Sequence, residues 1–183
     1  MKRWTLSLLA FLSLVTVPTL AADYAIDEHH VFATFKVEHL GIGYVVGRFN
    51  KITGNVNLDK GQIDITLHAD TVDSGHPKRD QHLKSPDFFN AKQFPKITFK
   101  SNKVTKTGKD RYRVEATITL LGKNKPVTLE LKKTGEGKDP WGGYRIGLES
   151  TFTVKRGDFG MTFMADGIGN EVEMYFSGEA IRK

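Results

Sequence analysis

The fold is indicated first by residues 31–38, which read VFATFKVE. Apolar side chains occupy the odd-numbered positions, and mostly polar side chains occupy the even-numbered ones. Successive side chains of an extended chain point to opposite faces, so this alternation predicts a β-strand with one buried and one wet face.

The same alternation recurs later in the chain, in residues 63–70 (IDITLHAD) and 114–120 (VEATITL). Further strands are predicted at 49–58, 96–104, 127–131, 144–154 and 171–181. Turn-forming residues separate the strands, as in Asp59-Lys60-Gly61. Because the loops between successive strands are short, we expect antiparallel neighbours and an all-β fold.

Two architectures can bury about eight strands that are each apolar on one face, namely a sandwich and a closed up-and-down barrel. Glycines inside predicted strands favour the barrel, because strands bend there at barrel corners. The glycines concerned are Gly47, Gly54, Gly147 and Gly178. The pattern alone leaves both architectures open.

The first 21 residues are predicted to be a cleaved secretory signal peptide. Lys2 and Arg3 precede an apolar stretch from Trp4 to Val17, which is shorter than the roughly 20 residues that span a bilayer core. Thr19-Leu20-Ala21 supplies the small-x-small pattern of a cleavage site. We therefore expect residues 22–183 to form one domain in the periplasm.

The composition excludes several classes of protein. There is no cysteine, so disulfides, thiol chemistry and cysteine metal sites are ruled out. The net charge is +6, and removing Lys2 and Arg3 lowers it to +4. This mild excess of scattered basic residues does not support nucleic-acid binding, and its simplest consequence is weak attraction to anionic membrane surfaces.

The segment from Val72 to Phe94 interrupts the β pattern and is predicted to be a short helical insertion. Ser85-Pro86 resembles a helix N-cap with a first-turn proline, and residues 80–83 could form a preceding helical turn. Four polar candidates for a binding site gather here: His76, Arg79, Asp80 and His82. They could hold a metal or simply cap turns, and Pro77 argues against one helix that carries both His76 and Asp80.

Motifs for covalent or phosphate chemistry are absent from the sequence. No Gly-x-Ser-x-Gly elbow is present, so a serine hydrolase is not supported. Residues 141–144 (WGGY) open a strand, whereas a phosphate-binding loop opens a helix. The many inward-facing phenylalanines could pack a solid core or line a tunnel, since an eight-stranded barrel permits either.

Three blocks of sequence resemble the YceI-like family of polyisoprenoid-binding proteins. They are residues 30–59 (HVFATFKVEHLGIGYVVGRFNKITGNVNLD), 71–101 (TVDSGHPKRDQHLKSPDFFNAKQFPKITFKS) and 118–131 (ITLLGKNKPVTLEL). The similarity continues through residues 139–143 (DPWGG) and 156–160 (RGDFG). It covers almost the whole chain after residue 21.

The resemblance implies an extended, lipocalin-like eight-stranded antiparallel barrel with a short helical insertion. It also implies a periplasmic, dimeric protein that encloses a long-chain isoprenoid or a similar amphiphile, such as a polyprenyl phenol, a quinone, a fatty acid or a fatty amide. It brings no catalytic residue, cofactor or metal site.

The strand alternation predicts which side chains line a lipid tunnel: Phe35, Val37, Phe49, Val56, Ile65, Leu67, Phe99, Ile118, Leu129, Ile146, Phe152, Met174 and Phe176. The lipid head is expected at one mouth, near the insertion, where His76, Arg79, Asp80 and His82 could bind it. Two other hypotheses remain. One is an envelope enzyme that uses His76, Asp80 and His82, and the other is a ligand-free interaction barrel.

Overall fold

The computed structural model describes residues 22–183. The predicted signal peptide therefore lies outside the described residues. The elements follow the chain as β1 (Tyr24–His39), β2 (Gly43–Phe49), β3 (Ile52–Asn57), β4 (Gln62–His68), η1 (Ala69–Thr71), β5 (Val72–Asp73), α1 (Pro77–Leu83), β6 (Lys96–Gly108), β7 (Arg111–Leu120), β8 (Lys123–Lys138), β9 (Tyr144–Lys155), η2 (Arg156–Phe159) and β10 (Ile168–Arg182).

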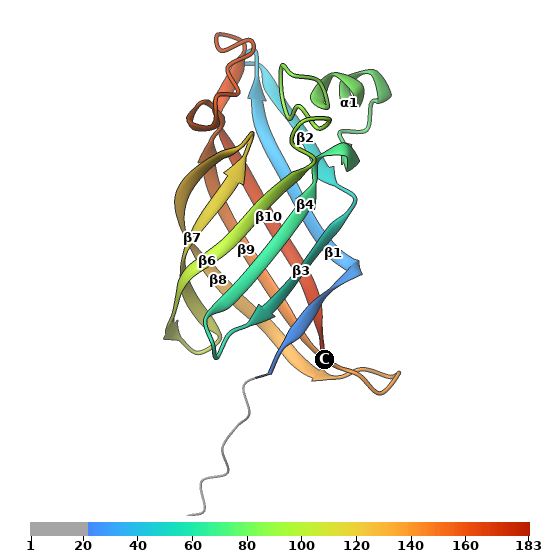
Figure 1. Ribbon diagram of the computed structural model, residues 1–183, viewed down its shortest axis with the longest axis vertical. Coiled ribbons are helices and arrows are strands. Elements are labelled where there is room, and N and C mark those ends of the chain that lie inside the picture. The colour runs from blue at the N-terminus through green and yellow to red at the C-terminus, as the bar shows by residue number, and fades with distance from the viewer. Residues whose placement is uncertain (1–21) are drawn as a thin grey trace, which may run out of the picture.

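The strands close into a barrel, which confirms the predicted architecture (Figure 1). Each strand of the wall pairs antiparallel with its neighbours, and β10 returns to pair with β1 along most of its length. Eight strands make up the ring: β1, β3, β4, β6, β7, β8, β9 and β10. Closure leaves no free edge around most of the wall. The sheets of a sandwich would have unpaired edge strands that must be protected in other ways.

Strand β1 has two partners on the side away from β10. Near its start it pairs with β3 through Tyr24 and Ala25, and from Thr34 to His39 it pairs with β2. Strand β2 therefore extends the wall beyond β3, toward the end of the barrel that carries α1. Its far edge meets only the short β5, through Arg48 and Phe49.

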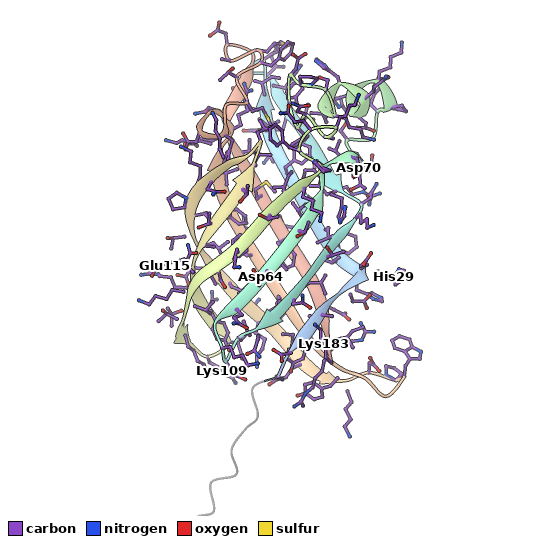
Figure 2. All side chains as sticks on the ribbon, in the orientation of Figure 1. His29, Asp64, Asp70, Lys109, Glu115 and Lys183 are labelled. Atoms are coloured by element: carbon purple, nitrogen blue, oxygen red, sulfur yellow. The ribbon has the colours of Figure 1, made fainter. Side chains whose placement is uncertain are left out.

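The two ends of the barrel differ (Figure 1). At one end lie α1, the β1–β2 turn and the segment from η2 to β10. The C-terminus and the β8–β9 turn lie at the other end, which we call the terminal end. Polar side chains such as Asp64 and Glu115 project from the outer wall between the two ends (Figure 2).

The helical insertion is present, but the helix begins at a different residue from the one predicted. Helix α1 starts at Pro77, and the imidazole Nδ1 of His76 caps it by accepting from the Arg79 backbone N–H at 3.3 Å. Proline suits the first helical position because its φ is already helical there. The prediction that Ser85 caps a helix is wrong, since Ser85 opens a series of turns in which its carbonyl accepts from Phe88 and Asn90.

Strand β8 also extends further than predicted. The predicted strand covered 127–131, whereas β8 begins at Lys123 and continues to Lys138, with a register shift between Lys133 and Gly135. The β8–β9 turn is organised by Asp139, whose carboxylate accepts from the backbone N–H groups of Trp141 and Gly143. The bulge leaves Thr134 unpaired, and Gly135 beyond it is paired with Gly147 on β9.

Two of the strand glycines occupy sites of close approach. A β-carbon on Gly54 would lie 2.3 Å from the backbone oxygen of Asp64 on the paired strand. One on Gly47 would lie 2.3 Å from the ring of Phe35, which covers that position from the barrel interior. Both positions need glycine because any side chain would overlap its neighbour.

The interior divides into two buried clusters. The cluster at the terminal end contains Tyr24, Ile26, Ile146 and Ala180, which are packed with little exposed surface. The cluster at the α1 end is built around phenylalanines, leucines and methionines from strands, α1 and the two long loops. Among residues 22–183, no helix has the length and apolar character needed to cross a membrane.

Candidate ligand tunnel

An apolar cavity of about 180 Å³ lies inside the barrel. Most of the side chains around it are aliphatic or aromatic, and the polar exceptions are Thr98, Ser150, Tyr175 and Arg156. A cavity of roughly 150 Å³ already admits a benzene-sized molecule. The space therefore suits a slender apolar chain.

The cavity is long and narrow. On β10 alone its lining runs from Ile168 to Phe176, which corresponds to about 27 Å of strand at roughly 3.3 Å per residue. With a strand tilt of about 40°, this becomes about 20 Å along the barrel axis. An extended hydrocarbon chain advances about 1.3 Å per carbon, so this length corresponds to roughly 16 carbons. The empty volume, by comparison with the benzene-sized cavity, takes only about seven or eight carbons, so a longer tail requires the lining side chains to move outward.

The two ends of the cavity are not equivalent. Toward the terminal end the lining stops at Val56, Leu131 and Leu148. Tyr24, Ile26, Ile146 and Ala180 are buried in the same cluster but do not line the cavity, and we call these four residues the solid cluster. Toward the α1 end the lining continues into the insertion, through Leu83 and the neighbouring residues 88 and 89. We call this α1 end the mouth.

Aromatic side chains surround the mouth in two groups. Phe35, Phe49 and Phe89 pack against one another with ring centroids 5.3 to 6.2 Å apart. His82 lies edge-on to both Phe88 and Phe163, at 5.0 and 5.1 Å. Tilted ring pairs of this kind are favourable, so they stabilise the packing of side chains around the mouth.

Arg156 is a buried cation that lines the cavity near the mouth. Its guanidinium donates five hydrogen bonds, all to backbone carbonyls, and no carboxylate lies within ion-pair distance among the described residues. The acceptors are the carbonyls of Met161, Phe163, Met164, Ile168 and Gly169. Burial lowers the pKa of Arg156 from its ordinary value. The side chain holds the loop between η2 and β10 over the barrel.

The interior offers no unsatisfied polar group to a ligand. The Ser150 hydroxyl donates to the Glu130 carbonyl at 2.7 Å. Within residues 22–183, every buried side-chain nitrogen or oxygen has a hydrogen-bond partner. The walls can therefore recognise a guest by shape and apolar contact rather than by a set of hydrogen bonds.

The structure places most of the residues predicted to line a tunnel around this cavity. These are Phe35, Val37, Phe49, Val56, Ile65, Leu67, Phe99, Ile118, Leu129, Phe152, Met174 and Phe176. Ile146 also points inward, but it is packed in the solid cluster at the terminal end and does not line the cavity. Contact between these side chains and a lipid remains a prediction.

The four polar residues of the insertion lie outside the cavity lining. Asp80 accepts from the backbone N–H and the hydroxyl of Ser74, and Arg79 donates to the Ser74 hydroxyl and carbonyl at 2.8 and 2.7 Å. His76 caps α1, and His82 bonds Asp87 at 2.8 Å. These hydrogen bonds stabilise the turns of the insertion. That the four polar residues also bind the head of a lipid stays a prediction.

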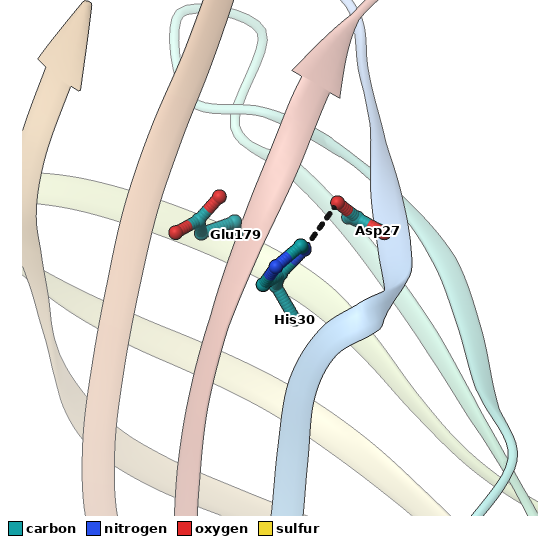
Figure 3. Close-up of side chains that lie close together, drawn as sticks. All are labelled: Asp27, His30 and Glu179. Carbon is teal, nitrogen blue, oxygen red and sulfur yellow. Dashed lines mark hydrogen bonds and ion pairs between the residues drawn. The ribbon is translucent and has the colours of Figure 1, made fainter. Parts of the chain in front are cut away.

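A second polar cluster lies near the terminal end, where β1 bulges between Ile26 and Val31. There Asp27, His30 and Glu179 come together in an arrangement that could suit a metal ion (Figure 3). The Arg145 guanidinium, however, already bonds Asp27 and Glu179 and also Asp139. Hydrogen bonding to Arg145 holds the pKa of Asp27 well below its usual range. The cluster is therefore an ion-pair network that ties strands together.

Sequence reasoning missed the lining contributed by the loops. Leu83, Phe88, Phe89 and Met161 reach the cavity from segments that have no strand alternation. Period-two patterning identifies inward faces only within strands, so it gives no signal for these residues. Arg156 was also missed, because a lone arginine in a loop is usually exposed.

Comparison with known proteins agrees with this architecture. Residues 24–180 match the model of the YceI-like domain. A UPF0312 protein of Yersinia pestis (strain Pestoides F) is 40% identical over 169 residues, covering 88% of each chain. Another UPF0312 protein, from Pseudomonas aeruginosa (strain LESB58), is 40% identical over 171 residues, covering 90% of this chain and 89% of the relative.

Solved structures have the same fold. BcnA of Burkholderia cenocepacia superposes with a TM-score of 0.75 at 21% identity, covering 84% of this chain and 98% of BcnA. The YceI protein of Campylobacter jejuni gives 0.70 at 27% identity, covering 81% and 91%. A polyisoprenoid-binding domain from Saccharophagus degradans gives 0.69 at 14% identity, covering 90% and 100%. The family model spans most of the chain, and the chain therefore belongs to the YceI-like domain family.

Proposed function

We propose that this protein is a carrier that holds the tail of one long-chain isoprenoid or similar amphiphile inside its barrel. The observation that carries the proposal is the narrow apolar cavity, which runs from the mouth to a solid cluster near the terminal end. The description of the Saccharophagus relative as a polyisoprenoid-binding domain supports the same class of ligand. Single-tailed amphiphiles fit this shape, whereas a two-chain lipid would need a wider interior.

The free energy of binding would come from apolar contact. At about 0.8 kcal/mol per methylene, a tail of roughly 7 carbons in the present cavity would contribute a gross 6 kcal/mol or so, and a tail of roughly 16 carbons in a widened cavity about 13 kcal/mol. The entropy lost when the tail and the side chains at the mouth become ordered would offset several kcal/mol of this gain. We therefore expect tight binding from water, and we expect longer tails to fold back or protrude from the mouth.

A bilayer competes for the same ligand. Its hydrocarbon core is as apolar as the tunnel, so most of the transfer free energy cancels when the lipid is taken from a membrane. The protein would then exchange its lipid with membranes rather than trap it. This behaviour suits a carrier or reservoir.

We infer that the protein binds its ligand without converting it. The polar side chains of the insertion are engaged in turns, and Asp27 and Glu179 beside His30 are both paired with Arg145. A periplasmic location rests on the predicted signal peptide in residues 1–21, and a dimer rests on the family resemblance. Both stay part of the proposal.

Filling the tunnel should test the proposal. Val172 lines the cavity, and Val46 on β2 faces outward, so Val172→Phe and Val46→Phe add the same volume on opposite sides of the wall. A polyprenyl phenol, a quinone and a fatty amide would be added to each purified variant. At 100 times its Kd, a ligand that binds only the folded protein contributes about 2.7 kcal/mol of stability.

We expect at least one of these ligands to raise the Tm of the parent and of Val46→Phe by roughly 5–10 °C. Val172→Phe should fold but show little or no rise. Equal ligand responses in the two variants, or none in the parent, would contradict the proposed site.

A further inference from the structure

Large apolar side chains are exposed at the same end of the barrel as the mouth. In the β1–β2 turn, Leu40 is 50% exposed and Ile42 is 88% exposed; Tyr44 follows at 65%. Met164, in the loop between η2 and β10, is 47% exposed. We call these four residues the apolar tip.

The apolar tip is held in a defined conformation. The Leu40 backbone N–H donates to the Gly167 carbonyl at 2.7 Å, which joins the β1–β2 turn to the loop of Met164. Leu40 also adopts a φ of 58°, in the left-handed region that favours glycine or asparagine. A strained, exposed leucine is unfavourable for the isolated fold, so its apolar character calls for a partner.

The tip adjoins the mouth of the tunnel. Val37 and Ile168 line the cavity, and His39 pairs with Ile168 only one residue before Leu40. A surface that the tip contacts would therefore face the opening through which a lipid enters.

The order of side chains along the hairpin matches the layers of a membrane interface. Residues 40–46 (LGIGYVV) carry no charge. Tyr44 follows Ile42 by two residues, which is about 7 Å along an extended chain. The Lys36 ammonium lies over the Tyr44 ring, 4.4 Å from its centroid. Tyrosine and lysine favour the headgroup layer, and interfacial apolar groups sink about 5–10 Å into a bilayer. The carboxylate of Glu38, opposite Tyr44 in the register, would also lie in this wet layer.

We propose that the apolar tip inserts into a lipid bilayer and sets the mouth of the tunnel against the headgroups. A second copy of the chain fits the tip less well. Four partly exposed side chains offer roughly 500 Å² in all, whereas a stable interface takes about 800 Å² from each partner. The proposal rests on the carrier function, because insertion lets a tail pass between membrane and tunnel without crossing water.

The test uses protein purified after export and vesicles of phosphatidylcholine, with and without 30% phosphatidylglycerol. The double variant Leu40→Asn, Ile42→Ser removes the apolar character and suits the left-handed turn, so it should fold at least as well as the parent. Trp141→Ser is the matched control, because Trp141 is 78% exposed in the β8–β9 turn at the terminal end. Vesicle partitioning should fall at least tenfold in the double variant and stay unchanged in the control.

A fluorescent reporter measures insertion directly. In a Trp141→Phe background, the tryptophan emission of Ile42→Trp should shift to the blue when vesicles are added, relative to the same variant without vesicles. Sedimentation velocity on the same samples reports the oligomeric state. The proposal would be overturned if the double variant partitioned like the parent, or if no blue shift appeared. It would also be overturned if the parent did not bind vesicles and formed a dimer that dissociated in the double variant.

The lipid content of each sample separates this inference from the carrier function. If native mass spectrometry finds lipid in the barrel but the tip variants partition like the parent, only the docking proposal fails. If no sample contains or accepts lipid, the carrier function fails as well.

Discussion

Replacing Phe35 by glutamate should test the assignment of inward and outward faces. Phe35 is buried against Phe49 and Phe89 and lines the tunnel. Truncating a buried phenylalanine costs about 3–5 kcal/mol. The cation in the cavity lining, Arg156, already donates to five backbone carbonyls, so a carboxylate at position 35 would be largely uncompensated. A pKa raised by about three units would add roughly 4 kcal/mol at pH 7.

The total of about 8 kcal/mol compares with a typical stability of 5–15 kcal/mol for a whole domain. At 2–4 °C of Tm for each kcal/mol, Phe35→Glu should melt at least 15 °C below the parent or fail to fold at pH 7. The loss should shrink as the pH falls toward 4. The introduced carboxyl has a folded pKa above its unfolded value, so its penalty exists only where the unfolded chain is ionised.

The control is Thr34→Glu, one residue earlier on the outer wall, where the cross-strand neighbour is Arg48. We expect a change of less than about 1 kcal/mol, because an exposed charge stays hydrated. Urea unfolding and thermal melts at pH 5 and pH 7 measure both variants. Similar stabilities for the two at pH 7 would refute the register on which the tunnel rests.

Three further variants test other parts of the structure. Arg156→Met leaves several loop carbonyls without donors and should lower the free energy of unfolding by about 3–5 kcal/mol in urea; a loss below 1 kcal/mol would contradict the role given to Arg156. Asp27→Asn should flatten the loss of stability on acidification. The lowered pKa of Asp27 makes its ionised form stabilising above about pH 4, and protonation removes that contribution at lower pH. If Asp27→Asn lost stability on acidification as steeply as the parent, this role of Asp27 would be contradicted. Gly54→Ala should cost about 1–3 kcal/mol, whereas Gly135→Ala, with open space around it, should cost less than 1; equal costs would count against the close approach at Gly54.

The strands and their inward faces could be predicted from the sequence because alternation reports directly on which side a residue faces. It does not report depth along the barrel axis. Ile146 and Phe152 lie on the same strand and the same face, yet Ile146 packs into the solid cluster and Phe152 lines the cavity. Whether the interior is solid or hollow depends on how opposite walls fill the space, which no single strand encodes.

The insertion shows a second limit. His76-Pro77 and Ser85-Pro86 both place a capping side chain before a proline, and only the first pair begins a helix. The mouth depends on contacts between segments far apart in the chain, such as the Leu40 N–H to the Gly167 carbonyl. Local propensity carries no record of such contacts, so the lining from loops and the apolar tip became visible only in the structure.

Whether the barrel holds one lipid tail can be read from native mass spectrometry of protein that is exported and purified without detergent. We expect a species heavier than the bare chain by one amphiphile, and we expect organic extraction to identify a single long tail at near one molecule per chain. A native mass equal to the bare chain, together with no rise in Tm on adding polyprenyl phenols, quinones or fatty amides, would contradict this expectation.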